Sequence, residues 1–206
     1  MVQPYTVPAA RHRVEEKIRR SHFITTLAPA NSVEEARAFI KEIRAEFDSA
    51  NHNCWAYLVG PPGSTAQVGM SDDGEPHGTA GRPMLTVLIH SGVGDVAAVV
   101  TRYFGGVKLG KGGLARAYSG GVKDALEGLQ RVEKTSRSSL EVVIGYSAVT
   151  LFQRMLPEYE AEIVARQFAA DVSFQLLMPD KYIEGFTTRL ADLTNGQGRV
   201  MVDPRA

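Results

Sequence analysis

A change of pattern at residues 130–139 limits the fold of this chain more than any other feature of its sequence. This segment, QRVEKTSRSS, is polar and charged, and the spacing of apolar residues differs on its two sides. Domain boundaries fall in such segments, because few contacts cross them. We therefore expect two domains, residues 1–132 and 133–206, which divide the 206 residues into one mid-sized and one small domain.

The block after the connector alternates strand and helix patterns. In chain order these patterns give βαββαβ, which is the order of a ferredoxin-like domain. We expect that fold for the second domain. The strand patterns cover residues 140–146, 162–168, 172–178 and 199–202, and the helical patterns cover 149–159 and 182–193.

The block before the connector also mixes helices with strands. Ser32 and Glu35 have the spacing of a capping box, and apolar residues then recur at helical spacing over 33–47. The whole chain is therefore expected to be an α+β protein of two α/β sandwich domains. The other predicted elements are two short strands or one bent strand over 13–27, strands over 54–59, 66–70 and 95–104, and helices over 82–90 and 112–129.

Charge and cysteine content exclude several classes of function. Lys plus Arg and Asp plus Glu are equal at 23 each, so the net charge gives no global attraction to nucleic acid or to a membrane. Cys54 is the only cysteine, which excludes an intramolecular disulfide and CxxC sites. Residues 1–21 lack the apolar core of a secretory signal, and no apolar stretch is long enough for a membrane helix. We expect a cytoplasmic protein with no membrane partner.

A local excess of positive charge lies between residues 102 and 123. This segment has five basic residues and no acidic one, and its glycines directly precede a predicted helix. Backbone N–H groups at a helix start can approach an anion, which the helix dipole favours. Tyr103 and Phe104 offer rings on which bases can stack. The candidate residues for binding nucleic acid or another anion are Arg102, Tyr103, Gly105, Gly106, Lys108, Gly110, Lys111, Gly112, Gly113 and Arg116.

The same residues also have an ordinary structural explanation. Glycines satisfy tight turns, aromatic rings fill cores, and cations form solvated surfaces. Residues 105–111 match the first seven positions of the P-loop pattern GxxxxGK, but the next residue is Gly112 instead of serine or threonine. Because that hydroxyl would be a magnesium ligand, we expect no P-loop nucleotide hydrolysis.

An acidic loop over residues 71–81 is the second candidate segment. Asp72, Asp73 and Glu75 lie close to His77, a combination that can bind a hard cation or perform acid–base chemistry. Their spacing fits no EF-hand, and Asp, Gly and Pro are common turn formers, so we favour a structural loop and expect no metal. The loop could also order the basic segment through ion pairs.

The pair of His52 and Cys54 suggests a nucleophile, but a small buried cysteine is the commoner case.

Several motifs in these two segments resemble those of the YigZ/IMPACT family. They are SDDGEP at 71–76, GTAG at 78–81, RYFGG at 102–106, Leu109 with Gly110, and GGL at 112–114. The matches are dense and occur in order over most of the first domain. The resemblance implies a ribosomal protein S5 domain 2-like fold for the first domain and a ferredoxin-like domain, similar to one near the end of the translocating elongation factor, for the second.

Both implied folds occur in proteins of translation. The resemblance therefore implies a translation-associated regulatory protein that binds RNA or the ribosome through the basic glycine-rich turn, or a protein partner in translation control. It supplies no catalytic residue and no cofactor, so we favour a non-enzymatic protein that needs none. Two alternatives stay open: an enzyme or sensor that binds a phosphorylated small molecule at the same turn, and a pure protein-interaction module.

Overall fold

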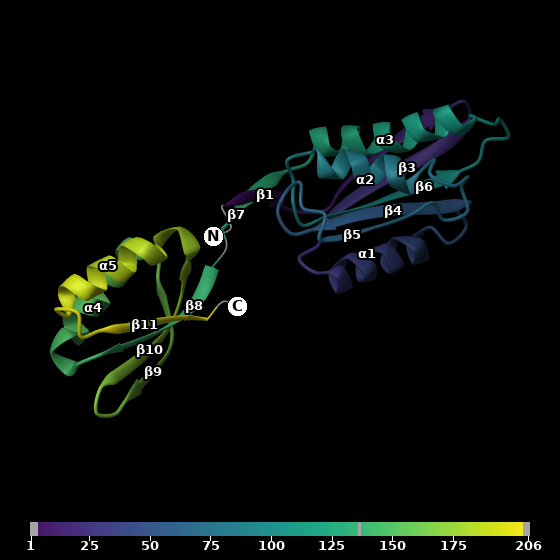
Figure 1. Cartoon of the computed structure of the whole chain (residues 1–206). Coiled ribbons are helices and arrows are strands. Elements are labelled where there is room, and N and C mark those ends of the chain that lie inside the picture. The colour runs from purple at the N-terminus through teal and green to yellow at the C-terminus, as the bar shows by residue number, and fades with distance from the viewer. Residues whose placement is uncertain (1–3, 136, 204–206) are drawn as a thin grey trace. The chain divides into compact units, whose positions relative to one another are not determined.

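The computed structural model describes residues 4–135 and 137–203 (Figure 1). They divide into two compact units. Tyr5–Lys134 form the first unit, and Pro4 together with the chain from Thr135 onward forms the second. Each unit packs helices against a β-sheet, so the expected α+β class with two domains is confirmed.

The first unit is built on a five-stranded antiparallel sheet with strand order β2-β3-β6-β4-β5. Helices α2 (Gly81–Ile89) and α3 (Lys111–Glu127) cover one face, and α1 (Val33–Glu46) covers the other (Figure 1). The strands are β2 (His12–Ile18), β3 (Ser21–Pro29), β4 (His52–Val59), β5 (Gln67–Ser71) and β6 (Val96–Tyr103).

The central strand β6 explains the long apolar run in the sequence. Val96, Ala98 and Val100 pack with α2 and α3, whereas Ala97 and Val99 pack with α1. Successive side chains of a strand point to opposite faces, and here both faces are covered, so every position is apolar. The last two residues of β6 are Arg102 and Tyr103. They lie at the end of the sheet where the two candidate segments begin.

The predicted start of α1 is confirmed, with a variation on the capping box. The Ser32 hydroxyl accepts a hydrogen bond from the Glu35 backbone N–H at 3.1 Å. The Glu35 carboxylate accepts from the backbone N–H of Asn31 at 2.8 Å instead of that of Ser32. Residues 13–27 form two strands, β2 and β3, which was one of the two alternatives.

Residues 130–139, expected to be the polar connector between the two domains, contain parts of two strands. Strand β7 (Arg131–Lys134) pairs antiparallel with β1 (Tyr5–Pro8), and β8 begins at Arg137. A two-stranded ribbon of this kind leaves most of β7 exposed, so its sequence shows no apolar alternation. The ribbon is tied to the first unit where Lys134 Nζ and the Tyr5 hydroxyl both contact Asp95 Oδ2, at 2.6 and 2.7 Å.

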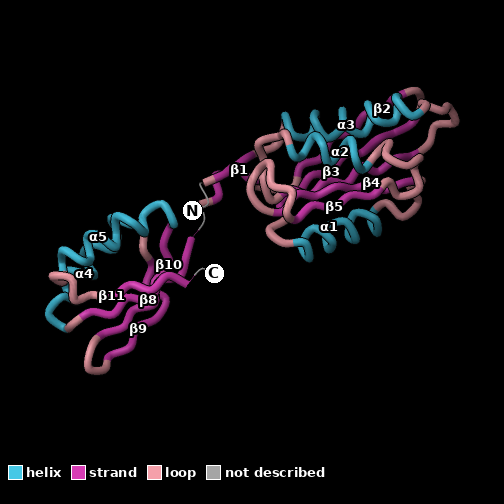
Figure 2. The backbone as a smooth tube through the Cα atoms, viewed as in Figure 1, coloured by secondary structure: helices cyan, strands magenta, loops and turns pink. Residues whose placement is uncertain are grey.

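The second unit has the predicted element order βαββαβ. Its four strands are antiparallel in the order β11-β8-β10-β9, and α4 and α5 pack on one face of the sheet (Figure 2). Three phenylalanines, Phe152, Phe174 and Phe186, form the centre of this core. The elements are β8 (Arg137–Ile144), α4 (Val149–Met155), β9 (Glu162–Phe168), β10 (Val172–Pro179), α5 (Ile183–Leu193) and β11 (Arg199–Asp203), with 3-10 turns at Tyr146–Ala148, Leu156–Tyr159 and Asp180–Tyr182.

Among the described helices, none combines the length and the apolar character that crossing a membrane requires.

Candidate functional site

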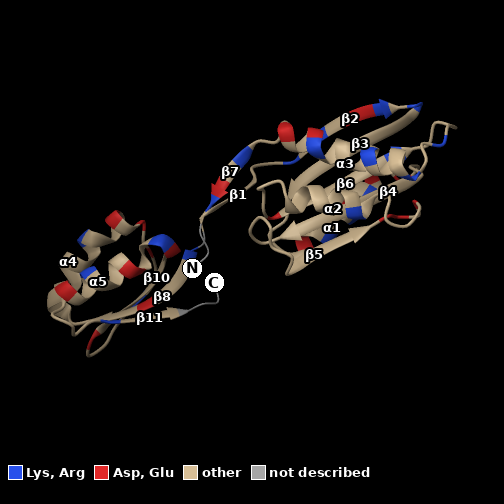
Figure 3. Cartoon of the chain, turned by 45° about the horizontal axis from the view of Figure 1, so that its top comes forward, with Lys and Arg blue, Asp and Glu red and all other residues tan. Residues whose placement is uncertain are grey.

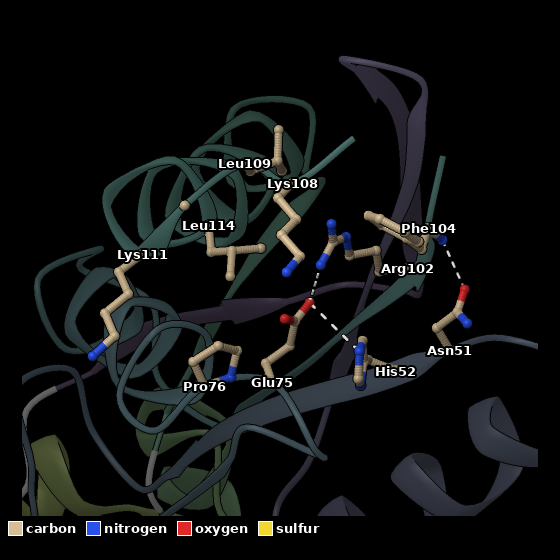
Figure 4. A pocket seen from close by; sticks show the side chains of 11 residues that line it. Asn51, His52, Glu75, Pro76, Arg102, Phe104, Lys108, Leu109, Lys111 and Leu114 are labelled. Carbon is tan, nitrogen blue, oxygen red and sulfur yellow. Dashed lines mark hydrogen bonds and ion pairs between the residues drawn. The ribbon is translucent and has the colours of Figure 1, made fainter. Parts of the chain in front are cut away.

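A pocket of about 440 Å³ lies in the first unit beside the start of α3, and we call it the α3 pocket (Figure 4). Four segments that are distant in sequence meet there: the start of β4, the acidic loop after β5, the end of β6, and the loop that leads into α3. Its lining residues are Asn51, His52, Glu75, Pro76, Arg102, Phe104, Lys108, Leu109, Gly110, Lys111 and Leu114.

The pocket brings together only part of the predicted set. From that set it contains Glu75, Arg102, Lys108, Gly110 and Lys111. Gly110 has φ of 75° and is the N-cap of α3, a backbone conformation that glycine adopts without strain. The glycine predicted at this turn is thus explained by geometry, while the two lysines beside it remain available for a ligand.

Other predicted residues lie elsewhere. Tyr103 occupies the next position of β6 after Arg102, and its ring stacks on His22 at a centroid distance of 6.3 Å. Arg116 lines a separate hollow of about 350 Å³, which also contains Glu16 and Asp124. Gly113 lines that second hollow, whereas Gly105, Gly106 and Gly112 line neither of the two.

The floor of the α3 pocket is a buried network centred on Glu75. Its Oε1 accepts hydrogen bonds from Arg102 Nη1 at 2.6 Å and from the Tyr118 hydroxyl at 2.7 Å. The Arg102 guanidinium lies 5.4 Å from the ring centroids of both Phe23 and Phe104. Only 5% of the Arg102 side chain and 3% of the Glu75 side chain are exposed. Arg102 therefore holds Glu75 in place and has little free charge for a phosphate.

His52 points from the start of β4 toward the same carboxylate. Its Nδ1 lies 2.8 Å from the backbone oxygen of Asp73, and its Nε2 lies 4.0 Å from Glu75 Oε1 (Figure 4). A carbonyl oxygen only accepts hydrogen bonds, so Nδ1 carries the proton. The other ring nitrogen, Nε2, lies on the side of Glu75 and therefore faces the pocket.

Cys54 takes no part in this arrangement. Its thiol is buried and donates to the backbone oxygen of Asp72 at 2.9 Å, and burial raises the pKa of the Cys54 thiol well above its usual value. A thiolate is the nucleophilic form of cysteine, so this residue is a small buried side chain and no nucleophile.

The acidic loop divides into two structural carboxylates and one that faces the pocket. Asp72 Oδ1 accepts from the backbone N–H groups of Ala80 and Gly81 at 2.9 Å each, at the start of α2. Asp73 pairs with Arg44 at 2.6 Å. The described residues contain no group of three or more His, Cys, Asp or Glu side chains arranged to hold a metal ion.

The cap at Asp72 predicts a pH-dependent stability. Burial alone would raise the pKa of this carboxyl, but the N–H groups of Gly78, Gly81 and Ala80 together lower the pKa below its usual 3.8. A pKa that is lower in the folded state gives stability above pH 3.8 that is lost as the pH falls through the folded value. Unfolding free energies measured from about pH 5 to pH 2 should therefore fall less steeply in Asp72→Asn. Asp48→Asn, at an exposed position, is the control, and an identical profile for both variants would contradict the assignment.

Lys108 and Lys111 are the free charges of the α3 pocket. In the described part of the chain neither ammonium group has an ion pair. The hypothesis that the acidic loop pairs with the basic segment thus applies to Arg102 only. In Figure 4 Lys108 extends toward Glu75 and Arg102, whereas Lys111 extends on the other side of Leu114.

Six residues that line the pocket were not among the site residues predicted from the sequence. Phe104 was considered only as a stacking ring, and His52 only together with Cys54. Their proximity depends on the pairing of β4 with β6, in which His52 lies opposite Arg102, and on the Asn51 side chain, whose oxygen accepts from the Phe104 N–H at 2.7 Å. Strand pairing of this range leaves no local signal. The missed residues are Asn51, His52, Pro76, Phe104, Leu109 and Leu114.

Comparisons with known proteins agree on the family. The model of the Impact N-terminal domain matches residues 19–126, and that of a domain of unknown function, DUF1949, matches residues 142–197. The IMPACT family member YigZ of Escherichia coli K12 is 41% identical over 195 residues, covering 95% of this chain and 96% of that protein. The IMPACT family member YvyE of Bacillus subtilis 168 is 36% identical over 183 residues, covering 89% and 83%.

A solved structure extends the agreement to the fold. The crystal structure of a hypothetical protein is 39% identical and superposes with a TM-score of 0.77, covering 100% of both chains. Together with the two matching domain models and the full-length relatives, this likeness shows that the chain belongs to the IMPACT family.

Proposed function

We propose that this protein is a translation-associated regulator, acting in the cytoplasm, that binds RNA at the α3 pocket. The observation that carries the proposal is that Lys108 and Lys111, which have no ion pair in the described part of the chain, line one pocket together with the ring of Phe104, which is 45% exposed. Ammonium groups attract backbone phosphates, and an exposed ring gives a base a surface on which to stack. The link to translation rests on the family resemblance of the folds.

Binding of this kind depends on local groups. Basic and acidic residues are interspersed over both units (Figure 3), and the chain has a formal net charge of +0. Phosphate contacts supply affinity but little choice of sequence. The protein should therefore bind single-stranded RNA with a strong dependence on salt and a weak dependence on sequence.

A second candidate is an enzyme or sensor for a phosphorylated small molecule. The volume of about 440 Å³ lies within the range of small-ligand pockets, roughly 300–1,000 Å³. A histidine and a buried carboxylate in one pocket can also move protons. Thermal unfolding with phosphorylated small molecules tests this second candidate, because a small ligand at about 100 times its Kd adds roughly 2.7 kcal/mol to stability.

Charge reversal at the two lysines tests RNA binding. In Lys108→Glu/Lys111→Glu the affinity for oligoadenylate RNA should fall by ~10-fold or more at low salt, because two phosphate contacts become repulsive. The slope of log affinity against log salt should become less steep by about 0.7 for each lost contact. Fluorescence anisotropy over a salt series measures both quantities.

Lys123→Glu is the control, since it reverses one lysine charge on α3 outside the pocket, as each of the two substitutions does at the pocket. Its salt slope should stay close to that of the parent chain. The proposal would be contradicted if RNA affinity did not change with salt concentration, or if both variants lost the same amount of affinity.

A further inference from the structure

The α3 pocket has two chemically different walls. Lys108 and Lys111 come from the loop before α3 and from its first residue, whereas Glu75 and His52 come from the acidic loop and the start of β4. In Figure 4 the Lys108 side chain extends toward Glu75, and Lys111 extends on the other side of Leu114. Phosphate is attracted to the first wall and repelled by the carboxylate of the second. A ligand that fills the whole pocket must therefore carry an anionic group at one end and hydrogen-bond donors at the other.

The second wall, formed by Glu75 and His52, contains hydrogen-bond acceptors that have no donor among the described residues, and we call it the acceptor wall. Both donors to Glu75, Arg102 and Tyr118, bond to Oε1, and no hydrogen bond to Oε2 is found in the described part of the chain. Nε2 of His52 is the second acceptor when the ring is neutral, since Nδ1 donates to the Asp73 carbonyl. Glu75 Oε2 and His52 Nε2 are thus both acceptors in the wall of one pocket, and Nε2 lies 4.0 Å from Oε1, the other oxygen of the same carboxylate.

Vicinal hydroxyl groups match such a wall. A ribose with free 2′ and 3′ oxygens presents two neutral donors, and carboxylates bind ribose hydroxyls in this way in dinucleotide sites. In a ribonucleotide the sugar separates these hydroxyls from the 5′ phosphate, and Lys111, on the other side of Leu114, lies away from the two acceptors (Figure 4). The base is then free to stack on Phe104.

We propose that the α3 pocket is specific for a ribonucleotide with a free 2′,3′-diol. Its 5′ phosphate lies at Lys108 and Lys111, and its hydroxyls donate to Glu75 and His52. This inference rests on the proposed function and narrows it. In an internal RNA nucleotide the 3′ oxygen carries a phosphate, which would lie against Glu75 and be repelled. The ligand is therefore the 3′ end of an RNA or a free ribonucleoside 5′-phosphate.

Chemical changes at the 3′ end test this on the unaltered protein. We compare a short oligoadenylate RNA with the same RNA ending in 2′-deoxyadenosine, in 3′-deoxyadenosine or in a 3′-phosphate. Each missing hydroxyl should weaken binding by about 10-fold, since hydrogen bonds to a charged acceptor are among the stronger ones. The 3′-phosphate should weaken it at least as much. Equal affinity for all four RNAs would overturn the inference.

Competition by adenosine 5′-monophosphate identifies the source of the ligand. If it displaces the RNA, the site also takes a free ribonucleotide. If it does not, while the 3′ end still matters, the RNA end is the ligand. The failures are also distinguishable: RNA binding that ignores the lysines contradicts the proposed function, whereas salt-dependent binding that ignores the 3′ end contradicts this inference only.

A variant assigns the preference to the acceptor wall. His52→Ala should bring the affinity ratio of free-diol RNA to one of the two deoxy-ended RNAs, 2′-deoxy or 3′-deoxy, toward one, and a general loss of stability does not change that ratio. His90→Ala, at an exposed position outside the pocket, is the matched control and should keep the ratio. An unchanged ratio in both variants would remove His52 from the site.

Discussion

Replacing Arg102 with methionine is expected to lower the free energy of unfolding by about 3–5 kcal/mol, the usual cost of removing one partner from a buried ion pair. The Glu75 side chain is 3% exposed, so its charge would be left in the interior, where the Tyr118 hydroxyl is the hydrogen-bond donor that remains among the described residues. Methionine keeps much of the packing between Phe23 and Phe104, so the measured loss reports mainly on charge. Urea unfolding followed by circular dichroism gives the value.

Two further variants make this prediction specific. In Arg102→Met/Glu75→Leu the orphaned charge is gone, so the double variant should be more stable than Arg102→Met alone. Arg116→Met removes an exposed arginine from α3 and should stay within about 0.5 kcal/mol of the parent chain. A loss in Arg102→Met as small as that in Arg116→Met would show that the network does not stabilise the fold.

The elements of this fold were predictable where the signal was local. The helix expected over 33–47 is observed at Val33–Glu46, because its cap and its apolar stripe lie in adjacent residues. The ribbon strand β7 was missed because both of its faces are largely exposed, so no apolar period marks it. Apolar residues recur at regular spacing because one face of an element is buried, so an element that buries few side chains shows no such spacing in the sequence.

The candidate site followed the same limit. Lys108, Gly110 and Lys111, which line the α3 pocket, could be grouped from the sequence because they are nearly contiguous and stand before a helix. Arg102 was grouped with them as a free cation, although its partner Glu75 lies 27 positions away in sequence. The sequence of neither segment predicts the contact between Arg102 and Glu75. It depends on how β6 pairs with its neighbouring strands and on the position of the acidic loop at the end of the sheet. The partner of a buried charge such as Arg102 therefore could not be predicted from this sequence.

Gly105→Ala is expected to destabilise the protein by about 3 kcal/mol, at the upper end of ordinary overpacking effects. A Cβ at this position would overlap the backbone carbonyl of Arg20 and come within 2.5 Å of the Ser21 backbone nitrogen. The neighbour is backbone in the β2–β3 turn, so it cannot rotate away as a side chain would. The strain must move either the turn or the loop that carries Lys108, and RNA affinity should fall together with stability.

Gly112→Ala is the matched control in the same glycine-rich segment. Apart from its chain neighbours and the backbone of α3 itself, no atom of the described residues lies within 4 Å of a Cβ built at Gly112, and the residue lies in the first turn of α3 at a negative φ. Alanine there should stabilise the protein by roughly 0.4–1 kcal/mol, because it reduces the freedom of the unfolded chain. Opposite signs in thermal unfolding of the two variants would separate a glycine required by close backbone packing from one that the fold does not require. Equal stability would mean that the approach of Gly105 to Arg20 does not constrain the turn, and the placement of Lys108 would then need another cause.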